Sequence, residues 1–466
     1  MSSCFPPNIT AALVEEPQLE FAMLFPLFEL VFTFASTAPY LICLFIIGLF
    51  SIPKYLRVHL FATPFLLLFM LAIHSAVESQ HFARLEGYNL SLPSKRAALE
   101  SYISTGDGNM TDIIEGGRYP PTFGTTELYW YLSTQLTESL LHNTIQDART
   151  LPEAYNKGDD WFEATLGEPM VYTCAIYPSS CETMWSAQHN KLDFISHALN
   201  IRPGDHVLDI GAGWGRLSAY YASKGANVTG VLMASDQQNY ANRLVENLGL
   251  SKYVDIRLQN FFDMQDPKGT YDAISAVEMA EHVGIRNYDM FLQKVHRLLK
   301  NDGTFYIQVA GLPRGYAKGY NHYEDIIWGL FMDEHVFPGA DASCPMGWVI
   351  TKLEQAGFEV QNVHNLGSHY SRTLSHWLQM WESKKEEISN VYGDKSWRRW
   401  RVFLAWSVRI ARKGGSTVQF ITATKSGQEK ARINTQKRLA PGAYKLPSKE
   451  KHGPGGGPST AFTNGL

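Results

Sequence analysis

The chain has 466 residues and a formal net charge of −4 at pH 7, and 45% of its residues are hydrophobic. This length exceeds one ordinary hydrophobic core, so two or three structural modules are expected, and the slightly negative charge disfavours nucleic acid as a partner. The cysteines form no Cys-x-x-Cys pair, which argues against a disulfide framework or a structural zinc site and favours reduced thiols. The five are Cys4, Cys43, Cys174, Cys181 and Cys344.

Two long uncharged stretches near the N-terminus predict a membrane-embedded helical hairpin over residues 21–77. They are residues 30–53 and 58–77, which contain 24 and 20 residues. About 20 apolar residues in a helix cross the roughly 30 Å hydrocarbon layer of a bilayer. A signal peptide needs a basic leader, but no Lys or Arg precedes Lys54. A buried core hairpin is the other alternative, although such a hairpin seldom stays uncharged on every face.

The rest of the chain divides by composition. Residues 1–20 form a polar N-terminus, 78–150 a connecting region, and 429–466 a tail whose composition predicts disorder. Between them, 151–428 alternate strands and helices, which predicts an α/β fold with a doubly wound, Rossmann-like sheet of seven strands. The strands are expected at 206–210, 228–233, 254–258, 271–277, 304–309, 358–364 and 417–424, and helices at 216–224, 237–248 and 288–299.

A glycine-rich loop follows the first predicted strand at its carboxyl end, where ligands lie in such sheets. The strand ends near Asp209, and Gly211, Gly213 and Gly215 follow, with Trp214 between the last two. Glycines let the backbone pass close under a ligand, although a simple turn is the alternative. The spacing is not Gly-x-Gly-x-x-Gly, and no carboxylate closes the second strand to bind a ribose in the usual way, which is also a departure from generic methyltransferases. The loop therefore favours a methyl donor, S-adenosyl-L-methionine, over a dinucleotide.

Five ordered blocks extend this interpretation beyond the loop. They are 154–162 (AYNKGDDWF), 170–175 (MVYTCA), 207–215 (VLDIGAGWG), 277–284 (VEMAEHVG) and 367–374 (GSHYSRTL). Together they resemble blocks of the cyclopropane fatty acid synthase and mycolic acid methyltransferase family, over residues from about 150 to 425. Gln308 stands where bacterial members have histidine. With the N-terminal hairpin and the segments 328–332 and 336–343, it makes the chain most similar to eukaryotic sphingolipid carbon-9 methyltransferases.

The resemblance implies a seven-stranded methyltransferase fold and methyl transfer from S-adenosyl-L-methionine to a lipid double bond. The acceptor would be carbon 9 of the sphingoid base of ceramide or glucosylceramide in a membrane. A methyl-branched alkene forms if the resulting cation loses a proton from a neighbouring carbon, and a cyclopropane forms if the new methyl loses it. Cyclopropanation of an unsaturated phospholipid acyl chain is therefore one alternative, and a non-catalytic lipid-binding relative is another. The sequence indicates no particular oligomeric state.

In the family, a bicarbonate ion beside the cation acts as the base. The positions that match its binding residues, through side chains or nearby backbone, are Cys174, Glu281, Gln308 and Tyr370. Glu281 would fix the anion through a shared proton or orient its donors, and Tyr370 would donate a hydrogen bond to it. Gln308 can donate one hydrogen bond but cannot shuttle a proton, which weakens the expectation of bicarbonate here. The structural alternatives are a helix N-terminal carboxylate for Glu281, a pocket wall for Tyr370 and packing for Cys174.

The resemblance also implies a set of cofactor-binding residues. They are Tyr172, Thr173, Asp209, Gly211, Gly213, Trp214, Gly215, Leu232, Gln237, Asn260 and Phe261. Tyr172 and Thr173 would lie near the methionine part and the glycines under the cofactor. Leu232 and Gln237 would border the ribose, and Asn260 and Phe261 the adenine, with ordinary core packing as the alternative for Phe261.

Two further features remain. His282 and His335 have no partner at metal-ligand spacing, so no metal is expected and both are interpreted as structural. Residues 397–406 mix arginine and tryptophan at helical spacing, which is typical of an interfacial helix or of a helix packed before the last strand.

The orientation in the membrane is predicted from two opposing arguments. Lys54 and Arg57 between the predicted spans favour a cytosolic connector, which would place the catalytic domain on the opposite side. S-adenosyl-L-methionine is held in the cytosol, so we expect the catalytic domain to face the cytosol, on the endoplasmic reticulum membrane. A re-entrant or interfacial hairpin would satisfy both arguments.

Overall fold

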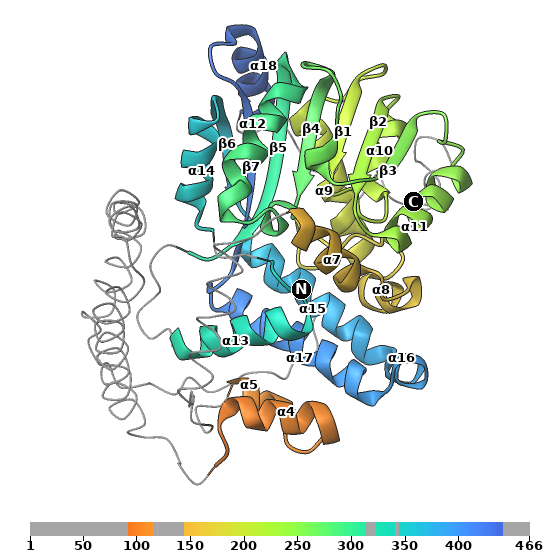
Figure 1. Cartoon of the computed structure of the whole chain (residues 1–466), viewed down its shortest axis with the longest axis vertical. Coiled ribbons are helices and arrows are strands. Elements are labelled where there is room, and N and C mark those ends of the chain that lie inside the picture. Colours follow the sequence, from red (N-terminus) through yellow and green to blue (C-terminus); the bar gives the residue numbers. More distant parts are fainter. Residues whose placement is uncertain (1–91, 116–118, 120–143, 314–321, 341–343, 441–466) are drawn as a thin grey trace, which may run out of the picture. The chain divides into compact units, whose positions relative to one another are not determined.

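The computed structural model describes residues 92–115, 119, 144–313, 322–340 and 344–440 (Figure 1). Contacts divide the chain into two compact units, Phe5–Leu92 and the remainder, and the second unit contains the sheet and every helix named below. The predicted hairpin at 21–77 lies outside the described residues. Among the residues that are described, no helix is both long and apolar enough to cross a membrane.

A single seven-stranded sheet is the centre of the fold, with the strand order β3-β2-β1-β4-β5-β7-β6. The strands are β1 (His206–Ile210), β2 (Asn227–Leu232), β3 (Val254–Leu258), β4 (Tyr271–Val277), β5 (Leu299–Gly311), β6 (Phe358–Asn365) and β7 (Thr417–Lys425). The first five are parallel, whereas β7 runs antiparallel to both β5 and β6. The seven predicted strands and the α/β sheet are confirmed, and the antiparallel β7 makes the sheet mixed.

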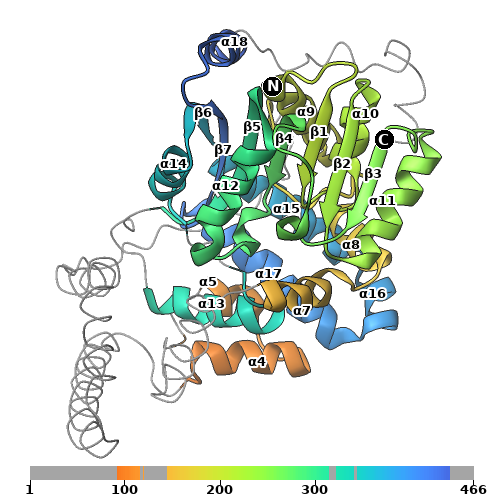
Figure 2. The ribbon, with the colours of Figure 1, turned by 45° about the horizontal axis from the view of Figure 1, so that its top comes forward.

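Helices cover both faces of the sheet, and a further group lies beyond the ends of its strands (Figures 1 and 2). They are α4 (Lys95–Thr105), α5 (Met110–Glu115), α7 (Thr144–Tyr155), α8 (Asp159–Leu166), α9 (Met184–Leu199), α10 (Arg216–Ser223), α11 (Ser235–Asn247), α12 (Tyr288–Leu298), α13 (His322–His335), α14 (Met346–Gln355), α15 (Gly367–Ser383), α16 (Lys385–Tyr392), α17 (Asp394–Arg412) and α18 (Glu429–Leu439).

Alternation along β5 separates the two cores on either side of the sheet. Phe305 and Ile307 point into a cluster with the buried residues of α12 and α14, whereas Tyr306 packs with α9 and α10 on the other face. Successive side chains of a strand point to opposite faces, so an apolar run such as β5 is buried on both. This is why the central strands β4 and β5 are buried along most of their length, whereas β3 at one end of the sheet alternates and buries only Ile256.

A third core forms among the helices beyond the sheet. Its tryptophans come from several helices and include Trp377 and Trp381 of α15 and Trp400 and Trp406 of α17, all almost fully buried. The interfacial alternative for 397–406 is therefore wrong and the packing alternative is confirmed, because these rings lie inside the protein. Arg398 donates to the carbonyl oxygens of Ile103 and Ser104, at 2.9 Å each, and so ties α17 to α4.

Helices α4 and α5 belong to this same core, although they fall in the predicted connecting region 78–150. Leu99 and Ile113 are buried in it. Lys95 is 1% exposed, because its ammonium donates to the carbonyl of Ile114 at 3.0 Å and lies 5.3 Å from the ring of Trp406. The described residues 95–115 of this region are thus part of the folded core.

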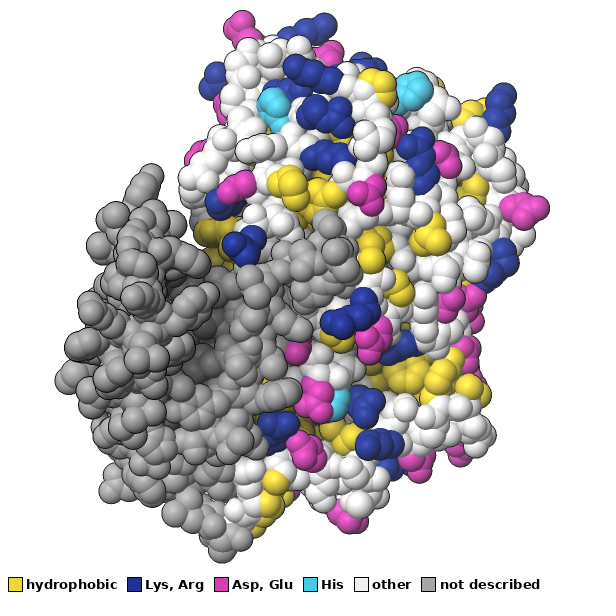
Figure 3. Space-filling view, viewed as in Figure 1, with side chains coloured by type: hydrophobic (Ala, Val, Ile, Leu, Met, Phe, Trp, Pro, Cys, Tyr) yellow, Lys and Arg dark blue, Asp and Glu magenta, His cyan; other side chains and the backbone are white. Residues whose placement is uncertain are grey.

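The chain also stays folded beyond residue 428. The predicted disorder of 429–466 is wrong for α18, because Ala431 and Thr435 are buried against the sheet and Arg438 donates to the carbonyl of Ala198 at 3.2 Å. Arg432 adds an ion pair with Glu359 at 2.9 Å. In the view of Figure 3, basic side chains gather in the upper part, where α18 lies in Figure 1. Residues 441–466 are outside the described residues.

The cysteines differ from expectation at one position. Cys174 and Cys344 are free and buried, but Cys181 is disulfide-bonded, so the expectation of reduced thiols is wrong for that residue. Among the described residues, no three His, Cys, Asp or Glu side chains are grouped as metal ligands.

Candidate active site

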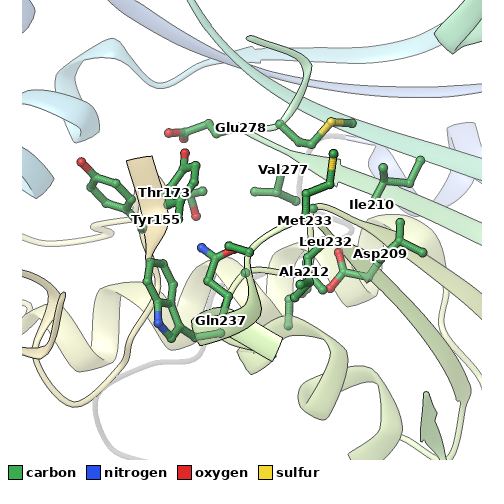
Figure 4. Close-up of a pocket in the computed structure, with 18 of the residues that line it drawn as sticks. Tyr155, Thr173, Asp209, Ile210, Ala212, Leu232, Met233, Gln237, Val277 and Glu278 are labelled. Atoms are coloured by element: carbon green, nitrogen blue, oxygen red, sulfur yellow. The ribbon is translucent and has the colours of Figure 1, made fainter. Parts of the chain in front are cut away.

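A pocket opens at the carboxyl ends of β1, β2 and β4, where the topology predicts a ligand site. Figure 4 shows Tyr155, Thr173 and Glu278 at one end of it, and Ala212, Leu232 and Gln237 farther along. Ten of the predicted cofactor residues line it: Tyr172, Thr173, Asp209, Gly211, Gly213, Trp214, Leu232, Gln237, Asn260 and Phe261. Gly215 is not among the lining residues.

The three loop glycines have different reasons to be glycine, although all have positive φ. A Cβ on Gly211 would lie 2.6 Å from Cγ of Met279, and one on Gly215 would lie 2.7 Å from Cβ of Ala241 in α11. At Gly213, a Cβ would meet no protein atom within 4 Å. Gly213 thus leaves space for a ligand, whereas Gly215 allows α10 and α11 to approach.

Asp209 stabilises the glycine loop through hydrogen bonds within the protein. Its carboxylate accepts hydrogen bonds from the hydroxyls of Ser218 at 2.7 Å and Ser275 at 3.0 Å. Burial raises the pKa of Asp209 to about 6. Both carboxylate oxygens therefore bond within the protein, and the side chain joins β1 to α10 and β4. Asn260 is similar, because its side-chain oxygen accepts from the backbone N–H of Phe262 at 2.9 Å.

Aromatic rings form one wall of the pocket. The ring of Trp214 lies 4.6 Å from that of Phe162 and 6.5 Å from that of Tyr172, between ring centroids. The Tyr155 hydroxyl and His282 Nε2 are hydrogen-bonded at 2.9 Å, so His282 positions a pocket residue. Such ring faces attract cations and exclude water. His335 lies apart from this wall, against Phe331.

Glu278 is the residue that the sequence analysis missed. It follows β4 directly, at φ 49°, and lines the pocket. Its Oε1 accepts from the backbone N–H of Cys174 at 2.8 Å and from the side-chain amide of Gln308. Burial raises the pKa of Glu278, against the opposing effects of the Cys174 hydrogen bond and the charge of Lys191. The position of a carboxylate immediately after a strand of this sheet was the available signal.

Two of the four predicted catalytic residues contact Glu278, and its charge acts on the other two, Glu281 and Tyr370, although none of the four lines the pocket. Gln308 is fully buried and donates to it, and Cys174 reaches it through the backbone. Burial raises the pKa of the Cys174 thiol and of Tyr370, and the charge of Glu278 adds to both effects. The Cys174 thiol is therefore protonated, which disfavours a nucleophilic role.

The segment that carries Cys174 is fixed by hydrogen bonds to α15 and α9. The backbone N–H of Ala175 donates to Thr373 Oγ1 at 3.1 Å, and that of Tyr177 donates to His369 Nδ1 at 2.9 Å. The side-chain amide of Gln188 donates to the carbonyl of Thr173 at 2.9 Å. These hydrogen bonds fix the backbone around Cys174, so that its N–H donates to Glu278.

Glu281 is a second buried carboxyl, deeper than Glu278. Its Oε1 accepts from the backbone N–H of Ala310 at 2.5 Å, and its Oε2 is buried without a hydrogen-bond partner. Burial, then the charge of Glu278, raises the pKa of Glu281 to about 8. At pH 7 Glu281 therefore carries a proton.

This pKa predicts how stability depends on pH. Because the folded-state pKa lies above the ordinary value of 4.5, the folded chain keeps a proton that the unfolded chain releases, and stability falls as pH rises from about 4.5 to 8. Glu281→Gln keeps the acceptor for Ala310 and removes this loss, on the order of a few kcal/mol. Urea unfolding at pH 5 and pH 8 should show a smaller difference for the variant than for the wild type. The exposed Glu386→Gln serves as control, and an unchanged difference in Glu281→Gln would contradict the assignment.

Residues 142–421 match the family of mycolic acid cyclopropane synthetases. The chain belongs to this family. The mycolic acid cyclopropane synthase CmaA1, solved in complex with SAH and CTAB, aligns with a TM-score of 0.56 and 25% identity, over 60% of this chain and 98% of that one.

Curated relatives of this family member include two fungal proteins. Sphingolipid C9-methyltransferase 2 of Gibberella zeae is 38% identical over 309 residues, covering 66% of this chain and 58% of the relative. Sphingolipid C9-methyltransferase of Komagataella phaffii is 38% identical over 307 residues, covering 64% and 62%. The chain thus spans less than two thirds of the length of these relatives.

Proposed function

We propose that this chain is an S-adenosyl-L-methionine-dependent methyltransferase acting on carbon 9 of the sphingoid base of ceramide or glucosylceramide. The product is a methyl-branched alkene. The observation that carries the proposal is one continuous pocket with two chemically different ends. A glycine-loop end suits a nucleoside, and an aromatic end with a buried carboxylate suits a developing cation. The two fungal relatives support the sphingolipid acceptor.

The residues present fit S-adenosyl-L-methionine. Gly213 leaves open space beside the loop, and the pocket continues past Leu232 and Gln237 to Phe261. Tyr172 has a buried hydroxyl without a hydrogen-bond partner and lines the pocket, so it can bond a polar ligand group. When bound, this donor supplies an electrophilic methyl group. The aromatic wall excludes water from the reacting carbons and faces the positive charge.

We further propose that the enzyme works at the endoplasmic reticulum membrane, with the catalytic unit facing the cytosol. A long-chain lipid acceptor supports a membrane location, and the uncharged stretches 30–53 and 58–77 support attachment near the N-terminus. Fractionation of cells expressing the full chain tests the membrane attachment. Recovery in the membrane pellet after a carbonate wash is expected, and recovery in the supernatant contradicts it.

The proposed reaction is tested with the full chain and vesicles. Glucosylceramide with a double bond between carbons 8 and 9 is incubated with methyl-labelled donor, beside the same lipid saturated there and an unsaturated phosphatidylcholine. Mass spectrometry should show labelled methylation of the sphingoid base in the first lipid alone. Catalytic deuteration then separates the products, because a branched alkene takes up deuterium and a cyclopropane does not.

Two outcomes would overturn the proposal. Label in the phosphatidylcholine acyl chains alone identifies a glycerolipid acceptor, with deuteration deciding whether the product is a cyclopropane. Absence of label in all three lipids, together with calorimetric binding of S-adenosylhomocysteine, would indicate a non-catalytic relative.

A further inference from the structure

We propose that the carboxylate of Glu278 is the built-in base of this site and replaces a bicarbonate ion. The proposal rests on the proposed function and names the group that finishes the reaction. The resemblance implies a bound bicarbonate ion, but in the structure the hydrogen-bond donors of Cys174 and Gln308 already bind the Glu278 side chain. Three observations and one chemical argument carry the proposal.

The first is that the donors are already used. The Cys174 backbone N–H and the Gln308 amide, two donors expected for bicarbonate, both bond Oε1 of Glu278. A bicarbonate ion there would lose these hydrogen bonds and lie against a second negative charge. Like charges in a buried site strongly disfavour joint ionisation. The site therefore does not fit the ion.

The second is that the placement of Glu278 is built into the backbone. At φ 49° it occupies the left-handed region, which costs a non-glycine residue on the order of 1–3 kcal/mol. Its own N–H donates to the carbonyl of Gln308 at 2.8 Å, which fixes this turn after β4. This left-handed conformation directs the carboxylate into the pocket, beside Tyr155 and Thr173 (Figure 4).

The third is that Glu278 and Glu281 lie in surroundings that favour different protonation states. Glu278 has two donors and the nearby Lys191, whereas Glu281 has one donor and an unpartnered oxygen. The ionised form is favoured where donors and a cation converge. Glu278 is thus the carboxylate and Glu281 the protonated acid, as their unequal surroundings require.

The chemical argument is that Glu278 can complete the reaction without a further reactant. The alkene π electrons form the new carbon–carbon bond to the methyl group while the sulfur–carbon bond breaks and sulfur keeps its electron pair. This leaves a cation on carbon 8. The carbon–hydrogen bond at the methylated carbon 9 then breaks, its electrons restore the double bond, and the proton passes to Glu278. Glu278 returns the proton to water after product leaves, so no further reactant is needed.

The first experiment needs no variant. Activity of the full chain in carbon dioxide-free buffer should equal that with added bicarbonate, within about twofold. A rise of tenfold or more on adding bicarbonate would overturn the proposal. Titration of ¹³C-bicarbonate into the wild type, followed by NMR, should show no binding, and saturable binding that S-adenosylhomocysteine does not alter would likewise overturn it.

The variants test the vacated site. Glu278→Ala should lose about 10²–10⁴-fold in kcat, bind ¹³C-bicarbonate at the freed donors, and regain at least about tenfold activity with bicarbonate or formate. Glu278→Gln keeps the side-chain volume, so it should lose activity similarly without rescue. Glu386→Gln is the exposed control, and S-adenosylhomocysteine binding shows that each variant is folded. Retention of activity by Glu278→Gln would overturn the proposal.

The NMR arm separates the two proposals. If the wild type methylates none of the test lipids, the proposed function fails. Binding of bicarbonate by Glu278→Ala but not by the wild type still supports occupation of the anion site by Glu278. Binding by neither variant nor wild type contradicts it.

Discussion

Gly211→Ala is expected to weaken the binding of S-adenosylhomocysteine by tenfold or more. Gly211 has φ 77°, and an added Cβ would lie 2.6 Å from Cγ and 2.8 Å from Cβ of Met279. The Met279 Cβ cannot swing aside as the end of a side chain can, so the backbone must move. Since Met279 and Gly211 both line the pocket, this shift deforms the place where the ligand lies. Isothermal titration calorimetry measures the change, and tenfold corresponds to about 1.4 kcal/mol.

Gly249→Ala is the matched control for this variant. Gly249 also has positive φ, 69°, but a Cβ there meets no atom within 4 Å. It should therefore show the cost of the left-handed conformation, about 1–2 kcal/mol of stability, with unchanged ligand affinity. Equal affinity losses in both variants would show that general destabilisation, rather than the loop geometry, is responsible.

The second large effect is expected at Trp400, in the helical core beyond the sheet. Its ring is 2% exposed, lies 5.3 Å from that of Trp161 and 4.9 Å from that of Phe403, and its N–H donates to Thr165 at 3.0 Å. Trp400→Ala should lower the free energy of unfolding by about 3–5 kcal/mol, because it leaves a large cavity. It also removes one of the two hydrogen bonds of the Thr165 hydroxyl, which still donates to the carbonyl of Trp161 at 3.2 Å. Chemical denaturation followed by circular dichroism measures the change in free energy.

Trp400→Phe refines this second prediction. It keeps most of the apolar contact and removes the hydrogen bond, so a loss clearly below that of the alanine variant is expected. The effect should extend to the pocket, because Trp400 packs on Phe162 and Phe162 packs on Trp214 of the glycine loop. A loss under about 1 kcal/mol for Trp400→Ala would contradict the assignment of this helix to a core.

The sheet and the glycine loop could be predicted because their signals are local. Strand β4 and residues 304–309 of β5 are short apolar runs, although β5 begins earlier than expected, at Leu299. The glycine loop after the first strand indicates the end of the sheet at which a ligand binds. The predicted cofactor residues also lie near one another because the carboxyl ends of adjacent parallel strands meet. Only Gly215 does not line the pocket. A close approach of two helices requires glycine just as a close approach of a ligand does, so the sequence cannot distinguish the two.

The rest depends on contacts distant in sequence. The sequence shows a carboxylate directly after β4, but not its hydrogen-bond partners, because Gln308 reaches the Glu278 side chain only when β4 and β5 pair. From the sequence, Glu281 was the better match to the family block, and nothing indicated the positive φ three residues earlier. Helix α18 is highly charged and buries little, so composition alone predicts disorder although its two buried residues dock it.

The position of β7 has a consequence for biosynthesis. This strand lies between β5 and β6, which do not pair with each other, yet it comes last of the three in the chain. Until residues 417–425 have left the ribosome, β5 presents an open edge of unpaired backbone groups. Such edges promote aggregation, and long-range pairing slows folding. A nonsense mutation before residue 417 would therefore yield an insoluble polypeptide rather than a shortened enzyme, and this protein must complete its sheet after translation of that strand.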